Sequence, residues 1–229
     1  DFEAYTGTGF ATTPSAGQLD ADEWSTTGLS DGSIAFGVEN TSGGHARGSG
    51  TGGSSGGFYA FDTGGNTVFG FQAAGSDFTP GTITLRIQNT TGGQISQINL
   101  SYDIYYDNAQ GRANSLNFSH SDDDATYVDI NSLDFTSPET LDANGWVSVN
   151  RSETISSLTL AEDGFYYFQW SSNDVSGTGS RDEIGLDNIS IELIPTSCTP
   201  VASFSGFTPN EGPVGTGITI LGSNFSSGS

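Results

Sequence analysis

The sequence lacks lysine and methionine, and it has a single cysteine among its 229 residues. Five arginines face 27 acidic residues, so the formal net charge is −22. A surface this acidic repels phosphate backbones and anionic lipids, so we expect neither nucleic acid nor a membrane as a partner. The lone Cys198 excludes a disulfide within the chain.

Long apolar runs are missing as well. No stretch approaches the ~20 apolar residues that a membrane-spanning helix needs, and no signal peptide is recognisable. The absence of methionine at position 1 indicates a chain that starts after processing or truncation. The 33 glycines, together with abundant Ser, Thr and Asn, are typical of secreted bacterial surface proteins. We therefore expect an extracellular or cell-surface location.

Catalytic motifs are scarce too. Neither His45 nor His120 belongs to a spaced metal motif such as H-E-x-x-H. No G-x-S-x-G sits between a strand and a helix, and Cys198 has no base near it in sequence. Paired carboxylates carry little information in a chain with 27 acids. The sequence therefore predicts that the chain is not an enzyme.

The sequence is rich in period-two alternation of apolar and polar residues. "INLSYDIYYD" (98–107) places Tyr102 and Ile104 on one face, and "TITLRIQN" (82–89) alternates in the same way. About ten such segments, bounded by Gly, Asn, Asp and Ser and without helices between them, predict two packed antiparallel sheets. We expect an all-β fold, an antiparallel β-sandwich or jelly roll.

Two segments interrupt the strands. The glycine-rich stretch 41–57 is the longest without periodicity and predicts a long loop, either a binding edge or merely a mobile segment. Asp122–Asp124 is expected to form a hairpin turn, because Asp favours turns through bonds from its side chain to the backbone. A metal loop at the same place is the alternative.

A change in composition after Leu193 predicts three parts. These are a module over 1–194, a linker over 195–200 that begins and ends with proline, and a new segment over 201–229. The new segment resembles the opening of immunoglobulin-like IPT/TIG domains, with a Pro–Gly-rich turn followed by G-T-x-V-T-I-x-G-x-N-F. The matching residues are Pro209, Gly212, Pro213, Gly215, Thr216, Ile218, Thr219, Ile220, Gly222, Asn224 and Phe225. Since such a domain needs about 100 residues, the resemblance implies a longer, modular protein whose second module is cut.

The stretch "RDEIGLDNISIEL" (181–193) contains a slip in the alternation. Ile184 and Leu186 share one phase, whereas Ile189 and the apolar residues after it fall in the other. The slip predicts a β-bulge at Asp187–Asn188, which would re-aim side chains and free a backbone carbonyl. Calcium prefers oxygen ligands of both kinds, so the bulge is a candidate metal site.

Two short motifs resemble jelly-roll carbohydrate-binding modules. These are the opening Phe2–Glu3 and the closing run from Leu186 to Ile191. In that family the first Glu and the last Asp hold a structural Ca²⁺, which implies Glu3 and Asp187 as ligands here. Asn188 stands where a second Asp is common, but it still offers a carbonyl oxygen.

Other acidic residues lie close to this bulge in sequence. Asp182 and Glu183 are further candidate calcium ligands, although Arg181 could pair with one of them instead. Ordinary turn-and-bulge chemistry without a metal remains the alternative to the whole site.

The sequence also offers candidate sugar contacts. Tyr105 lies on the polar face of its strand between Asp103 and Asp107. A sugar ring stacks on an exposed aromatic ring while neighbouring polar groups bond its hydroxyls, so these three residues are the predicted ligand-binding set. "FYYFQW" (165–170) is aromatic on both faces and fits either a second binding strand or a strand buried on both sides.

Three functional hypotheses follow. The first is a non-catalytic adhesion or carbohydrate-recognition module, stabilised by Ca²⁺, that binds a glycan or cell-surface polysaccharide at the front of a larger secreted protein. The second is an architectural subunit that self-associates into a filament, stalk or appendage. The third is an accessory domain of an extracellular hydrolase or nuclease.

Overall fold

The computed structural model describes residues 1–196 and 203–223. They fall into two compact units, Asp1–Pro195 and Thr196–Ser229. Most of the predicted linker, including Cys198, lies outside the described residues, as do Asn224 and Phe225 of the IPT/TIG-like motif. No helix in the described part is long and apolar enough to cross a membrane.

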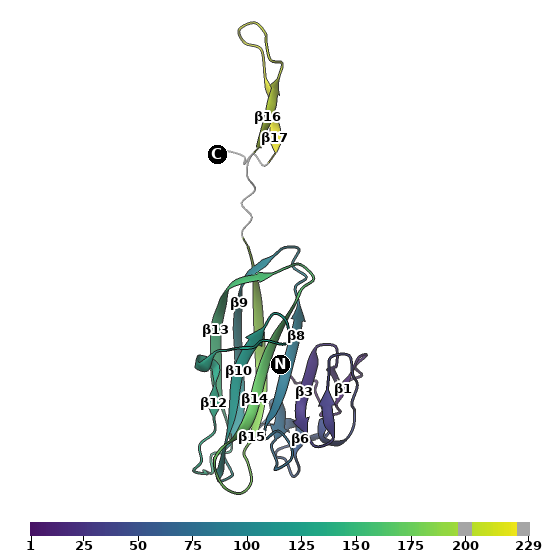
Figure 1. Cartoon of the computed structure of the whole chain (residues 1–229), viewed down its shortest axis with the longest axis vertical. Coiled ribbons are helices and arrows are strands. Elements are labelled where there is room, and N and C mark those ends of the chain that lie inside the picture. Colours follow the sequence, from purple (N-terminus) through teal and green to yellow (C-terminus); the bar gives the residue numbers. More distant parts are fainter. Residues whose placement is uncertain (197–202, 224–229) are drawn as a thin grey trace. The chain divides into compact units, whose positions relative to one another are not determined.

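The first unit is a sandwich of two sheets (Figure 1), which confirms the predicted all-β class. The seven-stranded sheet contains β3 (Trp24–Leu29), β4 (Gly32–Ile34), β8 (Gly81–Gln88), β10 (Arg112–Ser121), β11 (Val128–Asp129), β12 (Phe135–Thr136) and β14 (Phe165–Gly177). The six-stranded sheet contains β5 (Ser49–Gly50), β6 (Gly57–Asp62), β7 (Thr67–Gln72), β9 (Ile95–Asp107), β13 (Trp146–Leu160) and β15 (Glu183–Pro195). The remaining short elements of this unit are β1 (Phe10–Ala11), β2 (Leu19–Asp20), and the 3-10 turns η1 (Gly43–His45) and η2 (Asn131–Leu133).

The long strands alternate between the sheets as the chain proceeds. β8, β10 and β14 lie in the seven-stranded sheet in the order β10-β14-β8, and β9, β13 and β15 lie in the other in the order β13-β9-β15. All four pairings within these two groups are antiparallel. This alternation is the jelly-roll arrangement of an antiparallel sandwich.

Period-two alternation places the core between the sheets. In β14, Tyr166, Phe168 and Trp170 are buried, whereas Phe165 and Tyr167 face outward. The strand of the "FYYFQW" segment is therefore buried on one face only. The largest fully buried side chains are Trp170, Tyr102, Tyr166, Phe10, Phe58, Phe61, Phe69, Phe71, Phe78, Phe118, Phe168 and Ile34.

The predicted bulge is confirmed. The register between β15 and β9 shifts between Asp187 and Ser190, and Asn188 adopts a φ of 51°, in the left-handed region that Asn tolerates better than most residues. The Asp turn is also present, because the Asp123 carboxylate accepts the backbone N–H groups of Ala125 and Thr126 at 2.9 and 2.7 Å.

One strand is longer than the sequence predicts. Residues 146–150 and 157–160 read as separate strands, but they belong to the single 15-residue β13. A bulge lies between Ser156 and Leu160, with Ser157 at a φ of 63°. The bulge shifts the phase of the alternation, which is why the two halves look independent in sequence.

The second unit is described by an antiparallel hairpin of β16 (Ser203–Thr208) and β17 (Thr219–Ser223). Its apolar side chains are exposed, with Phe204 at 63% and Ile220 at 59%. The hairpin contains most of the residues that resemble an IPT/TIG opening, but two strands do not establish that domain.

Candidate ligand-binding faces and cation site

The predicted ligand residues lie on the outer face of the six-stranded sheet. Tyr105 is half-buried against a small apolar cluster of Tyr59, Phe61 and Val68, separate from the main core. The Asp103 carboxylate is already occupied, because Oδ1 accepts Asn150 Nδ2 and Oδ2 accepts Asn188 Nδ2, both at 2.8 Å. This face therefore offers a ligand fewer free groups than the sequence suggests.

Asp107 lies further along the same face, at the end of β9. Its partners in the ladder are Glu183 on β15 and Trp146 on β13. Partial burial raises the pKa of the Asp107 carboxyl, and the charge of Asp142 raises it further. The structure thus places Asp107 between Glu183 and Trp146, whose indole already packs on Phe61 with ring centroids 5.1 Å apart.

The glycine-rich segment docks on this face. The Trp146 indole donates to the Thr51 carbonyl at 3.0 Å, Gly53 N–H donates to Glu183 Oε1 at 3.0 Å, and the Tyr59 hydroxyl donates to the Ser55 carbonyl at 2.9 Å. The segment also contains η1 and β5. The side chains of Trp146 and Glu183, far away in sequence, thus hold the backbone of this segment against the sheet.

Two glycines lie directly beneath the apolar cluster of Tyr59, Phe61 and Val68. A Cβ added at Gly70 would lie 2.2 Å from Phe61 Cδ2, and one at Gly185 would lie 2.5 Å from Val68 Cγ2. The stacked rings of Tyr59 and Phe61, 5.0 Å apart, can approach the sheet this closely only over bare backbone.

The outer face of the seven-stranded sheet has a different chemistry. Ladder partners across β14 and β8 are Gln169 with Thr84 and Ser171 with Thr82, so short hydroxyl and amide side chains form rows. Gln169 Nε2 donates to Thr84 Oγ1 at 3.1 Å, and the hydroxyls of Thr27 and Thr82 lie 2.7 Å apart. Thr84 itself is buried, but Gln169 and the Thr27–Thr82 pair are accessible, and their uncharged donors and acceptors suit the hydroxyls of a sugar.

Aromatic rings border these rows at one end. Tyr167 and Phe36 have ring centroids 5.8 Å apart, and the Arg86 guanidinium lies 4.5 Å from the centroids of both Phe36 and Phe165. The side chain of Phe165 is 38% exposed. Contact with two rings, together with its bond to the Asp22 carbonyl, fixes the guanidinium in place.

A further aromatic residue, Tyr127, belongs to this border. Its hydroxyl donates to Asp124 Oδ1 at 2.5 Å. Burial raises the pKa of Tyr127, the bond to Asp124 adds to the effect, and its hydroxyl lies near Thr84 and Tyr167. Tyr127 therefore stays protonated near neutral pH; its single O–H is donated to Asp124, so its oxygen is left as an acceptor. We call the set Phe36, Arg86, Tyr127, Phe165, Tyr167 and Gln169 the aromatic–amide face.

Sequence reasoning named only part of this face. The aromatic segment 165–170 indicates Phe165 and Tyr167 as one of two alternatives, whereas the sequence does not indicate Phe36, Arg86 or Tyr127 as part of a binding face. The alternation 82–89 does place Arg86 on the polar side of its strand. Nothing in the sequence shows that Phe36, fifty residues earlier, would cover it.

The predicted calcium ligands Glu3 and Asp187 meet the same turn. Glu3 Oε1 accepts the N–H of Thr67 at 3.1 Å, and Asp187 Oδ2 accepts Asn66 Nδ2 at 3.0 Å. Asp187 is fully buried, and its Oδ1 has no hydrogen-bond partner in the described structure. A buried, half-satisfied carboxylate oxygen beside a bulge fits a hard cation.

The other two predicted ligands behave differently. Asn188 lies at the bulge but turns its amide to Asp103. Asp182 lies five residues before Asp187, about 16 Å away along an extended strand, so the two cannot share an ion. Among the described residues no group of three or more His, Cys, Asp or Glu is placed to hold a metal. A cation here would depend on amide and backbone oxygens as well.

No family model and no curated protein matches the sequence. One similar solved structure is a carbohydrate-binding module, CBM28, specific for non-crystalline cellulose; it is 14% identical, the match covers 59% of this chain and 80% of that one, and the TM-score is 0.41. A second is the enzymatically active domain of bacteriophage CBA120 tailspike protein 4, with 12% identity, 76% of this chain and 20% of that one covered, and a TM-score of 0.39. A third is the N-terminal cellulose-binding domain of Cellulomonas fimi β-1,4-glucanase C, with 11% identity, 77% of this chain and 94% of that one covered, and a TM-score of 0.36. At these identities and TM-scores the likenesses carry no argument about function.

Proposed function

We propose that residues 1–195 form a non-catalytic carbohydrate-recognition module that binds a glycan on the aromatic–amide face. The observation that carries the proposal is that the rings of Phe36, Tyr167 and Phe165 lie beside a row of uncharged amide and hydroxyl groups. Rings supply apolar stacking area and the polar rows supply hydroxyl contacts, which together make a sugar site. The predicted set around Tyr105 becomes the second candidate surface.

The wider setting belongs to the same proposal. The module would act in adhesion or polysaccharide recognition within a secreted or cell-surface, multidomain protein, and the hairpin 203–223 would open an IPT/TIG-like domain. A Ca²⁺ held by Glu3 and Asp187, with amide and backbone oxygens, would tie the amino terminus to the closing strand. The Asp187 oxygen without a partner supports this ion.

The test is binding to a panel of soluble polysaccharides by affinity electrophoresis and a glycan array. Tyr167→Ala should weaken binding to the recognised glycan about tenfold, since stacking on one ring is worth roughly 1 kcal/mol. Tyr105→Ala is the matched control on the other sheet and should leave binding unchanged. The reverse order would move the site to Tyr105.

The two other hypotheses predict different outcomes. Ordered self-assembly of the wild-type protein without binding to any polysaccharide would favour the architectural subunit. Polysaccharide binding that serves only to direct a covalently attached hydrolase or nuclease would favour the accessory domain. Light scattering and electron microscopy of the same preparation measure self-assembly.

A further inference from the structure

A group of polar side chains points into the core at one end of the sandwich. Asn108 continues the inward phase of Tyr106 on β9, and Asp182 precedes Ile184, which is fully buried, in the inward phase of β15. On the opposite sheet, Asn114 shares the inward phase of Leu116, and Ser172 follows Trp170. All four polar side chains are almost fully buried: Asn108, Asn114, Ser172 and Asp182 are exposed by 2%, 0%, 1% and 0%.

The topology brings these four residues to the same end. Residues 108–111 connect the end of β9 to the start of β10, and residues 178–182 connect the end of β14 to the start of β15. Asn114 is the third residue of β10 and pairs with Asp174, and Ser172 is the next inward residue along β14, opposite Leu116. The backbone N–H of Gln110 donates to Asp182 Oδ1 at 3.0 Å, so the two connections are also in contact.

Several polar atoms of this inward cluster have no protein partner. In the described structure the atoms without a hydrogen bond are Asn108 Oδ1, Asn114 Nδ2, Asn114 Oδ1, Ser172 Oγ and Asp182 Oδ2. The remaining atoms of Asn108 are well occupied, since its Nδ2 donates to the Thr140 carbonyl at 2.8 Å and to Asp142 Oδ2 at 3.0 Å. Buried polar groups left unpaired cost free energy, so their concentration at one place indicates a missing partner.

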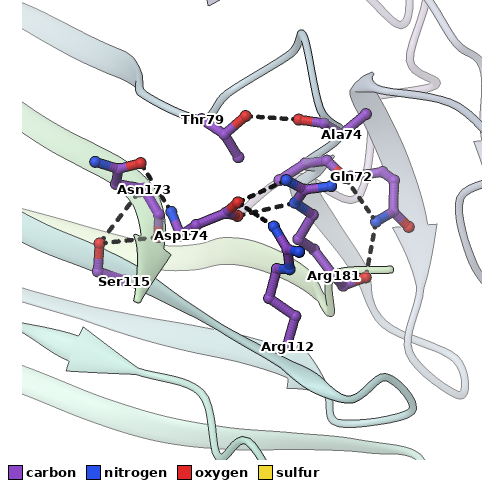
Figure 2. Close-up of polar contacts among 9 residues, drawn as sticks. Gln72, Ala74, Thr79, Arg112, Ser115, Asn173, Asp174 and Arg181 are labelled. Carbon is purple, nitrogen blue, oxygen red and sulfur yellow. Dashed lines mark hydrogen bonds and ion pairs between the residues drawn. The ribbon is translucent and has the colours of Figure 1, made fainter. Parts of the chain in front are cut away.

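The charged residues around the cluster indicate which kind of partner is missing. Arg112 and Arg181 flank the same connections, but both bond to Asp174 (Figure 2), Arg181 with 2.8 and 2.6 Å contacts. Burial raises the pKa of the Asp182 carboxyl; the Ser137 hydroxyl and the Gln110 N–H oppose this shift, and the charges of Asp107 and Asp142 add to it. An ionised Asp182 thus has no cationic side chain to compensate it and sits among acids.

We propose that the inward cluster binds one hard cation, Ca²⁺, through Asp182 Oδ2 and the neutral oxygens of Asn108, Asn114 and Ser172. Calcium accepts a mixture of carboxylate, amide, hydroxyl and water oxygens, and weak sites with few charged ligands occur in extracellular modules. The site is separate from the Glu3–Asp187 site, because Asp182 directly precedes β15 and lies about 16 Å from Asp187 along the strand. It would lock the two connections together at the end of the sandwich.

The test compares the full chain with Asp182→Asn in EDTA and in millimolar CaCl₂, by calorimetric melting and by isothermal titration of calcium. In EDTA the variant should melt at or above the wild-type temperature, because an uncompensated buried charge has been removed. In calcium the order should reverse, and the variant should bind one Ca²⁺ fewer per chain. Asp187→Asn should leave this reversal intact, so failure of the other proposed site is seen separately.

Ser172→Ala provides a second variant that removes a ligand with little change in packing. It should melt like the wild type in EDTA and weaken calcium binding several-fold. An Asp182→Asn variant whose melting temperature shifts equally in EDTA and in calcium, with unchanged stoichiometry, would overturn the proposal. Buried water or a protonated Asp182 would then satisfy the cluster.

Discussion

Arg86 and Phe165 stack on the outer face of the seven-stranded sheet, with the guanidinium carbon 4.5 Å from the ring centroid. The same guanidinium lies 4.5 Å from the ring of Phe36 and donates to the Asp22 carbonyl at 2.5 Å. One arginine therefore organises two rings and a backbone segment that are distant in sequence.

Arg86→Ala should disorder the border of the aromatic–amide face. Cation–π contacts at exposed sites are worth about 0.5–1 kcal/mol each, so we expect about 1–2 kcal/mol lower stability in urea denaturation and weaker glycan binding. Arg86→Lys should recover part of the stability but not the planar stacking. Equal stability of all three proteins would show that the stacked contact contributes nothing.

Asp174→Asn should weaken the contact that two of the five arginines make. Hydrogen bonds from Arg181, followed by those from Arg112, outweigh partial burial and hold the pKa of Asp174 below its usual 3.8. Hydrogen bonds to charged groups are worth about 1.5–3 kcal/mol, and we expect a loss within that range near pH 7.

The pH dependence of this effect has a definite sign. A carboxyl whose pKa is lowered by folding stabilises the protein above its unfolded pKa, and that stability is lost as the pH falls through the folded pKa. The difference in unfolding free energy between wild type and Asp174→Asn should therefore shrink below pH 3.8. Asp129→Asn, on the exposed edge strand β11, should show no comparable difference.

Gly70→Ala should destabilise the sandwich by about 1–3 kcal/mol, because the new methyl group collides with the ring of Phe61 above it. Gly75→Ala is the matched control: a Cβ there meets nothing within 4 Å. Faster hydrogen exchange of the Gly53 amide in the Gly70 variant would show that the docked glycine-rich segment loosens as well. If both variants were equally stable, the backbone at Gly70 beneath Phe61 would tolerate a side chain.

Removal of calcium should lower the melting temperature by several degrees if the Glu3–Asp187 ion is present, since a ligand that binds only the folded state stabilises it. Glu3→Gln and Asp187→Asn should each reduce the part of the shift that belongs to this site. A melting temperature independent of EDTA in the wild type would remove both proposed cations from the protein.

The sequence by itself determined the class of fold and the bulge. Alternation such as that of residues 98–107 states which side chains face the core, because successive side chains of a strand point to opposite sides. The slip at Asp187–Asn188 located the bulge for the same reason. Local periodicity carries this information within a few residues.

Only the tertiary structure decided which outward residues gather. Phe36 covers Arg86, the Thr51 carbonyl accepts the indole N–H of Trp146, and the Gln110 N–H donates to Asp182 at one end of the sandwich. Each of these associations depends on strand order and on the path of loops between the two sheets. Pairing between distant strands leaves no local signal in the sequence. The predicted site at Tyr105 and the grouping of Asp182 with Asp187 therefore rest on closeness in sequence, whereas the contacts in the folded chain depend on the strand order.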